Sequence, residues 1–468
     1  MDTQNSIYQM NIISFYNFAF TLICGLFLYP ILPCNAAEIV SISSTQDGQL
    51  FPQGVSDGKG GAVIVWEDYR TSKNWDVYAQ RIDNKNKLLW QLNGLPISVA
   101  DRNQRRIRMI GYDTHVIVVW NDRRGRSSWD IYAQAVNIDG KILWEKDGIP
   151  ICTNTADQST QAILSDGEGG AIFVWEDERN SSEFQDLYIQ RVNSAGETIW
   201  ELNGIPIHQS ESLQSNPILI AGEDEEFYIV WWDVVGHDQW HIMAHKFSIN
   251  GNPLWNAPIL ISPLEGMQGD HRVVSDQNGG LIVVWQIYKN FINDQLYAQR
   301  ISPDGNKVWD DAGIPICTAD GIQRNAAVVT DGNGGAIVAW RDERDIYSDI
   351  YAQRINADGT LIWEKDGIPI CMVGGHQDRP FIVPTKENQF FVAWIDYRGD
   401  FGDESVDALY CQQIDLDGNL IWDEDSIPIS TSEGEHFPPF VISDSKENLC
   451  VIWSNSQNDS GDIYLKRF

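Results

Sequence analysis

The sequence predicts an all-β protein, an eight-bladed β-propeller built from four-stranded antiparallel blades. Three observations support this prediction. A unit of roughly 55 residues recurs eight times along the 468-residue chain. Each unit contains four short runs of β-favouring residues, separated by turns rich in Gly, Asp and Pro. The two ends of the chain carry complementary parts of one unit.

Two tryptophan positions define the unit. One lies in a Val-x-Trp-like strand and recurs as Trp66, Trp120, Trp175, Trp231, Trp285, Trp340, Trp394 and Trp453. The other recurs as Trp90, Trp144, Trp200, Trp255, Trp309, Trp363 and Trp422. Together they account for fifteen of the nineteen tryptophans, so we expect both positions to serve the packing of every blade.

The sixth unit shows the expected order of strands, A to D. Glycines in the two hairpin turns allow the positive φ that tight turns need, and the frequent turns leave no room for helices. The expected strands are A (326–330), B (336–340), C (349–355) and D (361–370), with turns at 331–335 and 356–359.

The chain ends predict how the ring closes. The eighth unit stops after strand C, at 462–468, and lacks strand D. Near the other end, 39–43 precedes Gln49 with the spacing at which 367–371 precedes Gln377. Pairing of the two ends would complete the last blade and leave no open sheet edge. A β-solenoid is the structural alternative.

The repeated W-x-D-x-R and D-I-Y-A-Q-R motifs resemble those of uncharacterised, exported bacterial β-propeller proteins. In the sixth unit they read Trp340-Arg341-Asp342-Glu343-Arg344 and, after a short loop, 349–354. The resemblance covers essentially all of 38–468. It implies the fold and export, and it implies no particular activity.

The N-terminal segment predicts export. Residues 12–32 are almost wholly apolar, and the small-residue site Cys34-Asn35-Ala36-Ala37 follows. This pattern is typical of a signal peptide over 1–37, which leaves 38–468 as one propeller domain. Because no Lys or Arg precedes the apolar run, an uncleaved N-terminal anchor is the alternative. We expect the protein in a secreted, periplasmic or cell-surface location.

Charge and cysteine content limit the possible partners. The net charge of −33 repels phosphate backbones and anionic lipids, so we expect neither nucleic acid nor a membrane surface as a partner. Cys152, Cys317 and Cys371 occupy one repeat position in different blades, and they are expected to be small buried side chains without disulfides. We expect a monomer without a cofactor or metal.

Function is expected where the repeats differ, on the face that carries the B–C and D–A connections. Two repeated polar features are assigned to the fold instead. The first is a contact between an Arg after strand B and the Asp that opens strand C, such as Arg344 with Asp349. The second is the Gln that starts strand A, which is expected to satisfy backbone groups: Gln49, Gln104, Gln158, Gln214, Gln268, Gln323 and Gln377.

Aromatic and histidine side chains on that face are the candidate ligand contacts. Seven of the eight blades place an aromatic there, which would suit sugar rings or protein side chains, and the alternative is that each aromatic covers a seam between blades. Blade four adds a histidine-rich loop, but it has no metal motif such as H-E-x-x-H. The candidates are Trp75, Trp129, Phe184, Trp232, His237, Trp240, His241, His271, Phe291, Tyr347 and Phe401.

The sequence therefore predicts a binding propeller whose variable face engages glycan or protein. The alternatives are a propeller hydrolase or lyase that acts on polysaccharide through carboxylates in the central channel, and a passive cell-surface scaffold. No nucleophile elbow, phosphate-binding loop or dinucleotide motif occurs in the sequence, and no catalytic residue is assigned.

Overall fold

The computed structural model describes residues 38–125, 128–180, 184–235, 239–288, 293–385, 388–398, 407–422, 426–432, 434–443, 449–457 and 460–468. All regular secondary structure in these segments is β-strand. Within them, no helix is long and apolar enough to cross a membrane. The predicted signal segment 1–37 lies outside the described residues.

The strands follow the repeat. Repeat 1 contains β2 (Gln49–Ser56), β3 (Ala62–Asp68), β4 (Asp76–Ile82) and β5 (Leu95–Ser98), and repeat 2 contains β6 (Gln104–Gly111), β7 (His115–Asp122), β8 (Asp130–Asn137) and β9 (Ile149–Cys152). Repeat 3 contains β10 (Gln158–Ser165), β11 (Ala171–Asp177), β12 (Asp186–Val192) and β13 (Ile205–Pro206). Repeat 4 contains β14 (Leu213–Ala221), β15 (Glu226–Val235), β16 (Gln239–Ser248) and β17 (Ile259–Leu260). Repeat 5 contains β18 (Met267–Ser275), β19 (Leu281–Tyr288), β20 (Asn293–Ile301) and β21 (Ile314–Cys317), and repeat 6 contains β22 (Gly321–Thr330), β23 (Ala336–Asp342), β24 (Asp349–Ile355) and β25 (Ile368–Cys371). Repeat 7 contains β26 (Gln377–Pro384), β27 (Gln389–Asp396), β28 (Ala408–Asp415) and β29 (Ile427–Ser430). Repeat 8 contains β30 (Glu435–His436), β31 (Phe440–Ser443), β32 (Leu449–Gln457) and β33 (Ser460–Arg467), together with β1 (Val40–Ser43) from the N-terminal end.

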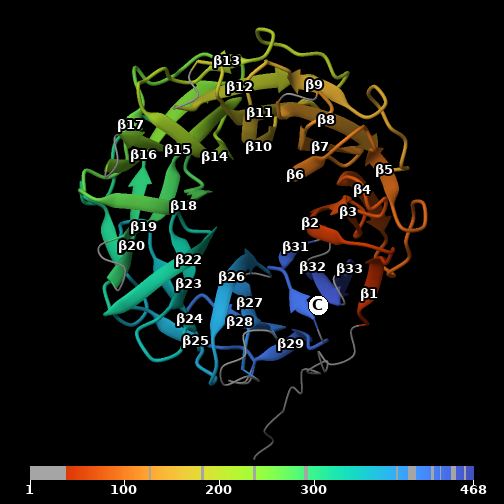
Figure 1. Ribbon diagram of the computed structural model, residues 1–468. Coiled ribbons are helices and arrows are strands. Elements are labelled where there is room, and N and C mark those ends of the chain that lie inside the picture. The colour runs from red at the N-terminus through yellow and green to blue at the C-terminus, as the bar shows by residue number, and fades with distance from the viewer. Residues whose placement is uncertain are drawn as a thin grey trace, which may run out of the picture. The chain divides into compact units, whose positions relative to one another are not determined.

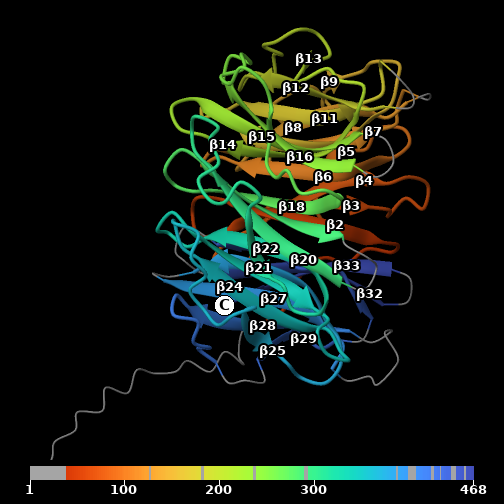
Figure 2. The ribbon, with the colours of Figure 1, turned by 90° about the vertical axis from the view of Figure 1, so that its left-hand side faces the viewer.

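Each repeat forms an antiparallel sheet in the order A-B-C-D. The repeats follow one another around a common centre, and the A strands β2, β6, β10, β14, β18, β22, β26 and β31 lie nearest to it (Figure 1). Seen from the side, the strands run along the axis of this arrangement (Figure 2). The N-terminal strand β1 pairs with the C-terminal strand β33, with Val40 opposite Leu465. This is the pairing that the incomplete last unit predicts.

Two departures from the expected strands have clear local causes. Strand D of the sixth repeat is only four residues long, since Gly367 N–H bonds to Glu364 O at 3.0 Å and forms a turn where the sequence predicted a continuous strand. Strand A of the eighth repeat is split into β30 and β31. Pro438 and Pro439 lie between them and cannot donate backbone hydrogen bonds to a sheet.

The first tryptophan of each repeat is fully buried, and in five repeats its indole N–H binds an Asp that also binds an Arg, an arrangement that we call the staple. Trp340 Nε1 donates to Asp342 Oδ2 at 2.8 Å, and Asp342 in turn binds the Arg344 guanidinium at 2.7 Å. Arg344 lies over the Tyr351 ring at 3.9 Å. The predicted partner Asp349 was therefore wrong, because the indole already orients the nearer carboxylate toward the Arg.

The second tryptophan position joins neighbouring repeats. Trp309 Nε1 donates to Ala357 O of the next repeat at 3.2 Å. Gly359 has φ 90°, and a Cβ there would lie 2.9 Å from the Trp309 ring. Gly359 is thus favoured both by its backbone conformation and by the close approach of the indole.

Two other framework predictions are tested by the contacts. Gln158 Nε2 donates to Ala156 O at 2.6 Å, as expected, whereas the Gln323 amide has no partner among the described residues. All five described cysteines are free and buried. Burial raises the pKa of the Cys371 thiol to about 11, which is consistent with an unreactive packing role.

Candidate functional site

Strand A carries a β-bulge in seven of the repeats. The pairing register between strands A and B shifts between the first and fourth residues after the framework Gln, for example between Arg105 and Arg108. The second residue after the Gln takes the left-handed conformation that non-glycine residues rarely adopt. Described examples have φ between 48° and 57°: Phe51, Arg106, Asn216, Asp270, Asn325 and Arg379.

The bulge turns two variable side chains of each A strand toward the centre. The second and fourth residues after the Gln are exposed or half-buried, while the third is buried between repeats. We call these two positions the inner ring. Its described members are Phe51, Gln53, Arg106, Arg108, Ala162, Asn216, Ile218, Asp270, Arg272, Asn325, Ala327, Arg379 and Phe381, with Pro438 and Phe440 at the equivalent places in the eighth repeat.

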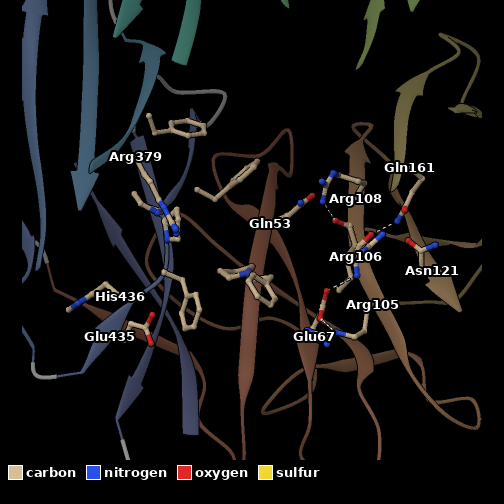
Figure 3. A pocket seen from close by; sticks show the side chains of 18 of the residues that line it. Gln53, Glu67, Arg105, Arg106, Arg108, Asn121, Gln161, Arg379, Glu435 and His436 are labelled. Carbon is tan, nitrogen blue, oxygen red and sulfur yellow. Dashed lines mark hydrogen bonds and ion pairs between the residues drawn. The ribbon is translucent and has the colours of Figure 1, made fainter. Parts of the chain in front are cut away.

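Part of the inner ring lines a cavity of about 1210 Å³. The cavity lies where A strands begin and B strands end, in repeats 7, 8, 1, 2 and 3, and some of its lining is shown in Figure 3. This is the end of the sheets that carries the B–C and D–A connections. The face expected to vary therefore does hold the cavity, although most of the lining comes from strand residues rather than loops.

Four phenylalanines form an apolar surface in this cavity. The Phe51 and Phe437 rings meet edge to face with centroids 5.6 Å apart, and the Phe381 and Phe440 centroids are 5.9 Å apart. Phe51 is 45% exposed although it is large and apolar. We call these four rings the phenylalanine platform. Flat apolar rings of this kind are suited to stacking against a ligand ring.

Arginines from two repeats flank the platform. Arg106 and Arg108 come from β6, and Arg379 comes from β26 across the cavity (Figure 3). The Arg106 backbone N–H donates to Glu67 Oε1 at 2.6 Å, and Arg105 Nε donates to Glu67 Oε2 at 2.8 Å. Glu67 thus holds the bulge of the next repeat in place.

Arg108 is the least compensated of these cations. It donates to Ile107 O at 2.9 Å, and no ion pair is formed by its guanidinium within the described part of the chain. The Arg108 side chain is solvent-accessible, although protein atoms of the surrounding strands displace much of the water around it. This desolvation lowers the pKa of Arg108, although the nearby Glu67 carboxylate opposes the shift.

A buried polar network borders the cavity at the seam between repeats 7 and 8. His436 takes the place of the framework Gln, and its Nδ1 lies 2.8 Å from Asp407 Oδ1. On the other side of the ring, Nε2 lies 2.9 Å from Ser430 Oγ. Ser430 is only 2% exposed, so a ligand in the cavity does not reach its hydroxyl. The network fits the seam role of the residue that it replaces.

The predicted loop aromatics are placed differently from one another. Trp129 lines the cavity at its rim. Trp75 instead packs beside Tyr69 at 5.0 Å and under the Arg105 guanidinium at 4.8 Å, which is the seam-covering arrangement. Phe184 is 40% exposed, and Tyr347 contacts the His376 ring at 5.4 Å.

The blade-four candidates form a separate cluster. The Trp232 ring lies 5.6 Å from Trp240 and 5.7 Å from His271, and His241 pairs across the hairpin with Asp233. Burial lowers the pKa of His271 to about 3, so this imidazole is neutral. Within the described segments, no three His, Cys, Asp or Glu side chains gather as a metal site would require. The candidates His237, Phe291 and Phe401 lie outside the described residues.

Sequence reasoning missed the inner ring. It placed function on the B–C and D–A connections, and in strand A it considered only the recurring Gln, which it assigned to the framework. The available indication was that the second and fourth residues after this Gln change from Arg to Phe, Asn, Asp or Ala between repeats.

No protein-family model and no curated protein matches the chain. Solved structures do. A lectin from Burkholderia pseudomallei aligns with a TM-score of 0.50 and 13% identity, over 83% of this chain and 100% of the lectin. The polysaccharide lyase Uly1 gives a TM-score of 0.48 and 11% identity, over 90% and 99% of the two chains. A PL25 ulvan lyase gives 0.47 and 8%, over 81% and 97%.

The chain has the β-propeller fold. At these identities the likeness concerns the arrangement of the strands and not the residues of any site. The chemistry of the cavity therefore rests on the residues of this chain.

Proposed function

We propose that this protein binds a glycan in the cavity, with a sugar ring stacked on the phenylalanine platform. The proposal includes an exported, monomeric propeller of eight blades in which β1 completes the last blade. The observation that carries the proposal is the partly exposed platform inside a cavity that polar side chains also line. Isolated exposed phenylalanines are common on proteins, but two contacting pairs within one concave site are typical of a ligand surface.

The composition of the cavity suits a saccharide. Sugars present flat C–H faces that stack on aromatic rings and hydroxyl groups that need hydrogen-bond partners. Amide and guanidinium groups, including Gln53 and Arg108, surround the platform. Because the cavity exceeds the roughly 300–1,000 Å³ of a small-ligand pocket, it has room for an oligosaccharide.

Trp129, which also lines the cavity, extends the proposed surface outward along the variable face. Trp75 is not part of this proposal, because its ring is committed to the seam with Arg105.

The second candidate function is an enzyme that acts on polysaccharide. The specific observation in its favour is the His436–Asp407 pair, which lines the same cavity and holds an imidazole in a fixed orientation. The expected carboxylates are also present, but Glu67 and Asp157 are engaged by backbone N–H groups of Arg106 and Trp129. We favour binding, since the Ser430 hydroxyl that His436 Nε2 contacts is buried away from the cavity.

A glycan array on the mature protein, followed by titration calorimetry, tests the proposal. We expect Phe437→Ala to weaken binding of the selected saccharide by tenfold or more, since stacking contacts of this kind contribute about 1–3 kcal/mol. Phe184→Ala is the matched control outside the cavity lining and should change affinity by less than about twofold. Equal losses in the two variants, or binding that is insensitive to Phe437, would contradict the proposal.

Product analysis separates the two candidates. The selected glycan is incubated with the protein and examined for new reducing ends and for unsaturated products. A binding protein leaves the glycan intact. Cleavage that is abolished by His436→Gln, a return to the side chain of the other repeats, would favour the enzyme.

A further inference from the structure

We infer that the ligand of the cavity is an acidic saccharide, whose carboxylate or sulfate group is bound by the inner-ring arginines. This inference rests on the proposed function and adds the chemical class of the glycan. It is drawn from the distribution of charge in the molecule and from the position of the arginines beside the platform.

The inner ring reverses the charge balance of the chain. Acidic residues outnumber basic residues by 66 to 33 in the whole protein. At the described inner-ring positions, four arginines face a single acidic residue, Asp270. That carboxylate accepts a hydrogen bond from the Tyr288 hydroxyl at 2.8 Å. The cationic members are Arg106, Arg108, Arg272 and Arg379.

Two arginines of the cavity, Arg108 and Arg379, lie apart from the carboxylates Glu67 and Glu435 (Figure 3). In Figure 3, Arg108 and Arg379 lie on opposite sides of one region, while Glu67 and Glu435 lie in another. Glu67 is in addition bound to Arg105 at 2.8 Å. In this view neither of the two carboxylates lies between Arg108 and Arg379.

Two of these arginines lack a close counter-ion. The nearest acidic contact of Arg379 is Asp378 at 3.8 Å, and its side chain is 57% exposed. Arg108 forms no ion pair with the described residues, and the enclosing strands desolvate it. A guanidinium without a close counter-ion is free to form charge-assisted hydrogen bonds with an anionic ligand group.

The backbone also indicates a binding role for these side chains. Arg106 and Arg379 both occupy bulge positions with positive φ, at 57° and 52°. A long side chain in this conformation is strained, and such strain is concentrated at ligand sites. Equivalent positions in other repeats hold Phe51, which also lines the cavity, or the more tolerant Asn and Asp.

The charge outside the cavity limits the form of the ligand. The net charge of −33 repels a long polyanion that would extend beyond the cavity. The inner arginines therefore fit a short acidic oligosaccharide, or the end of a chain, that enters the cavity. Uronic acids and sulfated sugars share this chemistry.

Titration calorimetry with defined probes tests the inference. The probes are trigalacturonate, a sulfated heparin disaccharide, and neutral maltotriose and xylotriose. We expect an acidic probe to bind at least tenfold more tightly than either neutral probe. The two acidic probes distinguish a carboxylate from a sulfate. Raising the salt from about 0.05 to about 0.5 M should weaken acidic binding severalfold, because the ion pairs are screened.

The variants are Arg379→Gln and the double variant Arg108→Gln with Arg379→Gln. Each should lower the affinity for the acidic probe by tenfold or more, with little change for a neutral one. Arg102→Gln, an exposed arginine in a D–A connection outside the cavity, is the control and should retain full affinity. Near-ultraviolet circular dichroism checks that the double variant is folded. If it is not, the single variant Arg379→Gln, at an exposed position, is used for the test.

The outcomes separate the two levels of the proposal. Tight binding of a neutral probe that depends on Phe437 but not on the arginines overturns the inference and leaves glycan binding intact. Binding of none of the saccharides overturns the proposed function as well. The inference would also be overturned if poly-glutamate bound in an arginine-dependent way while none of the acidic saccharides bound.

Discussion

Replacing Ile42 tests whether β1 is a structural part of the propeller. Ile42 is 1% exposed and packs in a cluster with Ile463 and Leu465 of β33 and with Trp66 of the first blade. Ile370, at the equivalent place in the internal strand β25, is also 1% exposed. Truncation of a buried Ile to Ala removes burial and leaves a cavity, which costs about 2–5 kcal/mol.

If β1 completes the last blade, Ile42→Ala should destabilise the protein as much as Ile370→Ala does. Ile39→Ala, at a 43% exposed position just before β1, is the control and should cost no more than about 0.5 kcal/mol. Guanidinium unfolding followed by tryptophan fluorescence gives the three midpoints. The reasoning is refuted if Ile42→Ala unfolds like Ile39→Ala while Ile370→Ala is strongly destabilised.

Three further predictions concern the framework and its titration. Burial, with the charges of Asp345 and Asp342, raises the pKa of Asp349 to about 7. The folded state therefore favours the protonated carboxyl. The resulting contribution to stability is fully present below the pKa of the unfolded state and is lost as pH rises through about 7. The melting temperature of Asp349→Asn minus that of the wild type should therefore increase from about pH 5 to about pH 8, and a constant difference would contradict the assigned pKa. Arg344→Ala leaves the buried Asp342 without its counter-ion, so it should lower stability by about 3–5 kcal/mol in denaturant unfolding; a loss below about 1 kcal/mol would show that the staple is unimportant. Trp75→Ala should lower the melting temperature and leave glycan affinity unchanged, whereas Trp129→Ala should weaken glycan binding and leave the melting temperature unchanged. Thermal melts and calorimetry measure the two effects. The opposite pattern would mean that the two rings were assigned the wrong roles.

The repeat made most of the fold predictable. Each blade must bury a tryptophan at the same place in strand B, so eight copies of one solution are visible in a single chain. The pairing of β1 with β33 followed from the missing strand in the last unit. The length of strand D did not, because a turn such as that of Glu364 to Gly367 reads as a continuation of the neighbouring β-type residues.

The sequence predicted the face on which the candidate site lies, the one that carries the B–C and D–A connections, but not most of the residues that line it. Loop aromatics are easy to recognise, but whether a ring such as Trp75 covers a seam depends on an arginine of the next blade. The bulge in strand A was not predictable from alternation, since an extra residue changes which side chains face the centre. The Arg344 partner was misassigned because two aspartates recur with the arginine, and only the indole hydrogen bond distinguishes them.

A crystal structure with the tightest-binding oligosaccharide tests the central claim most directly. The account predicts a sugar ring stacked on Phe51 and Phe437, with its acidic group at Arg108 or Arg379. A saccharide bound on the outer loops, for example at Phe184 or Tyr347, with the cavity unoccupied, would contradict it.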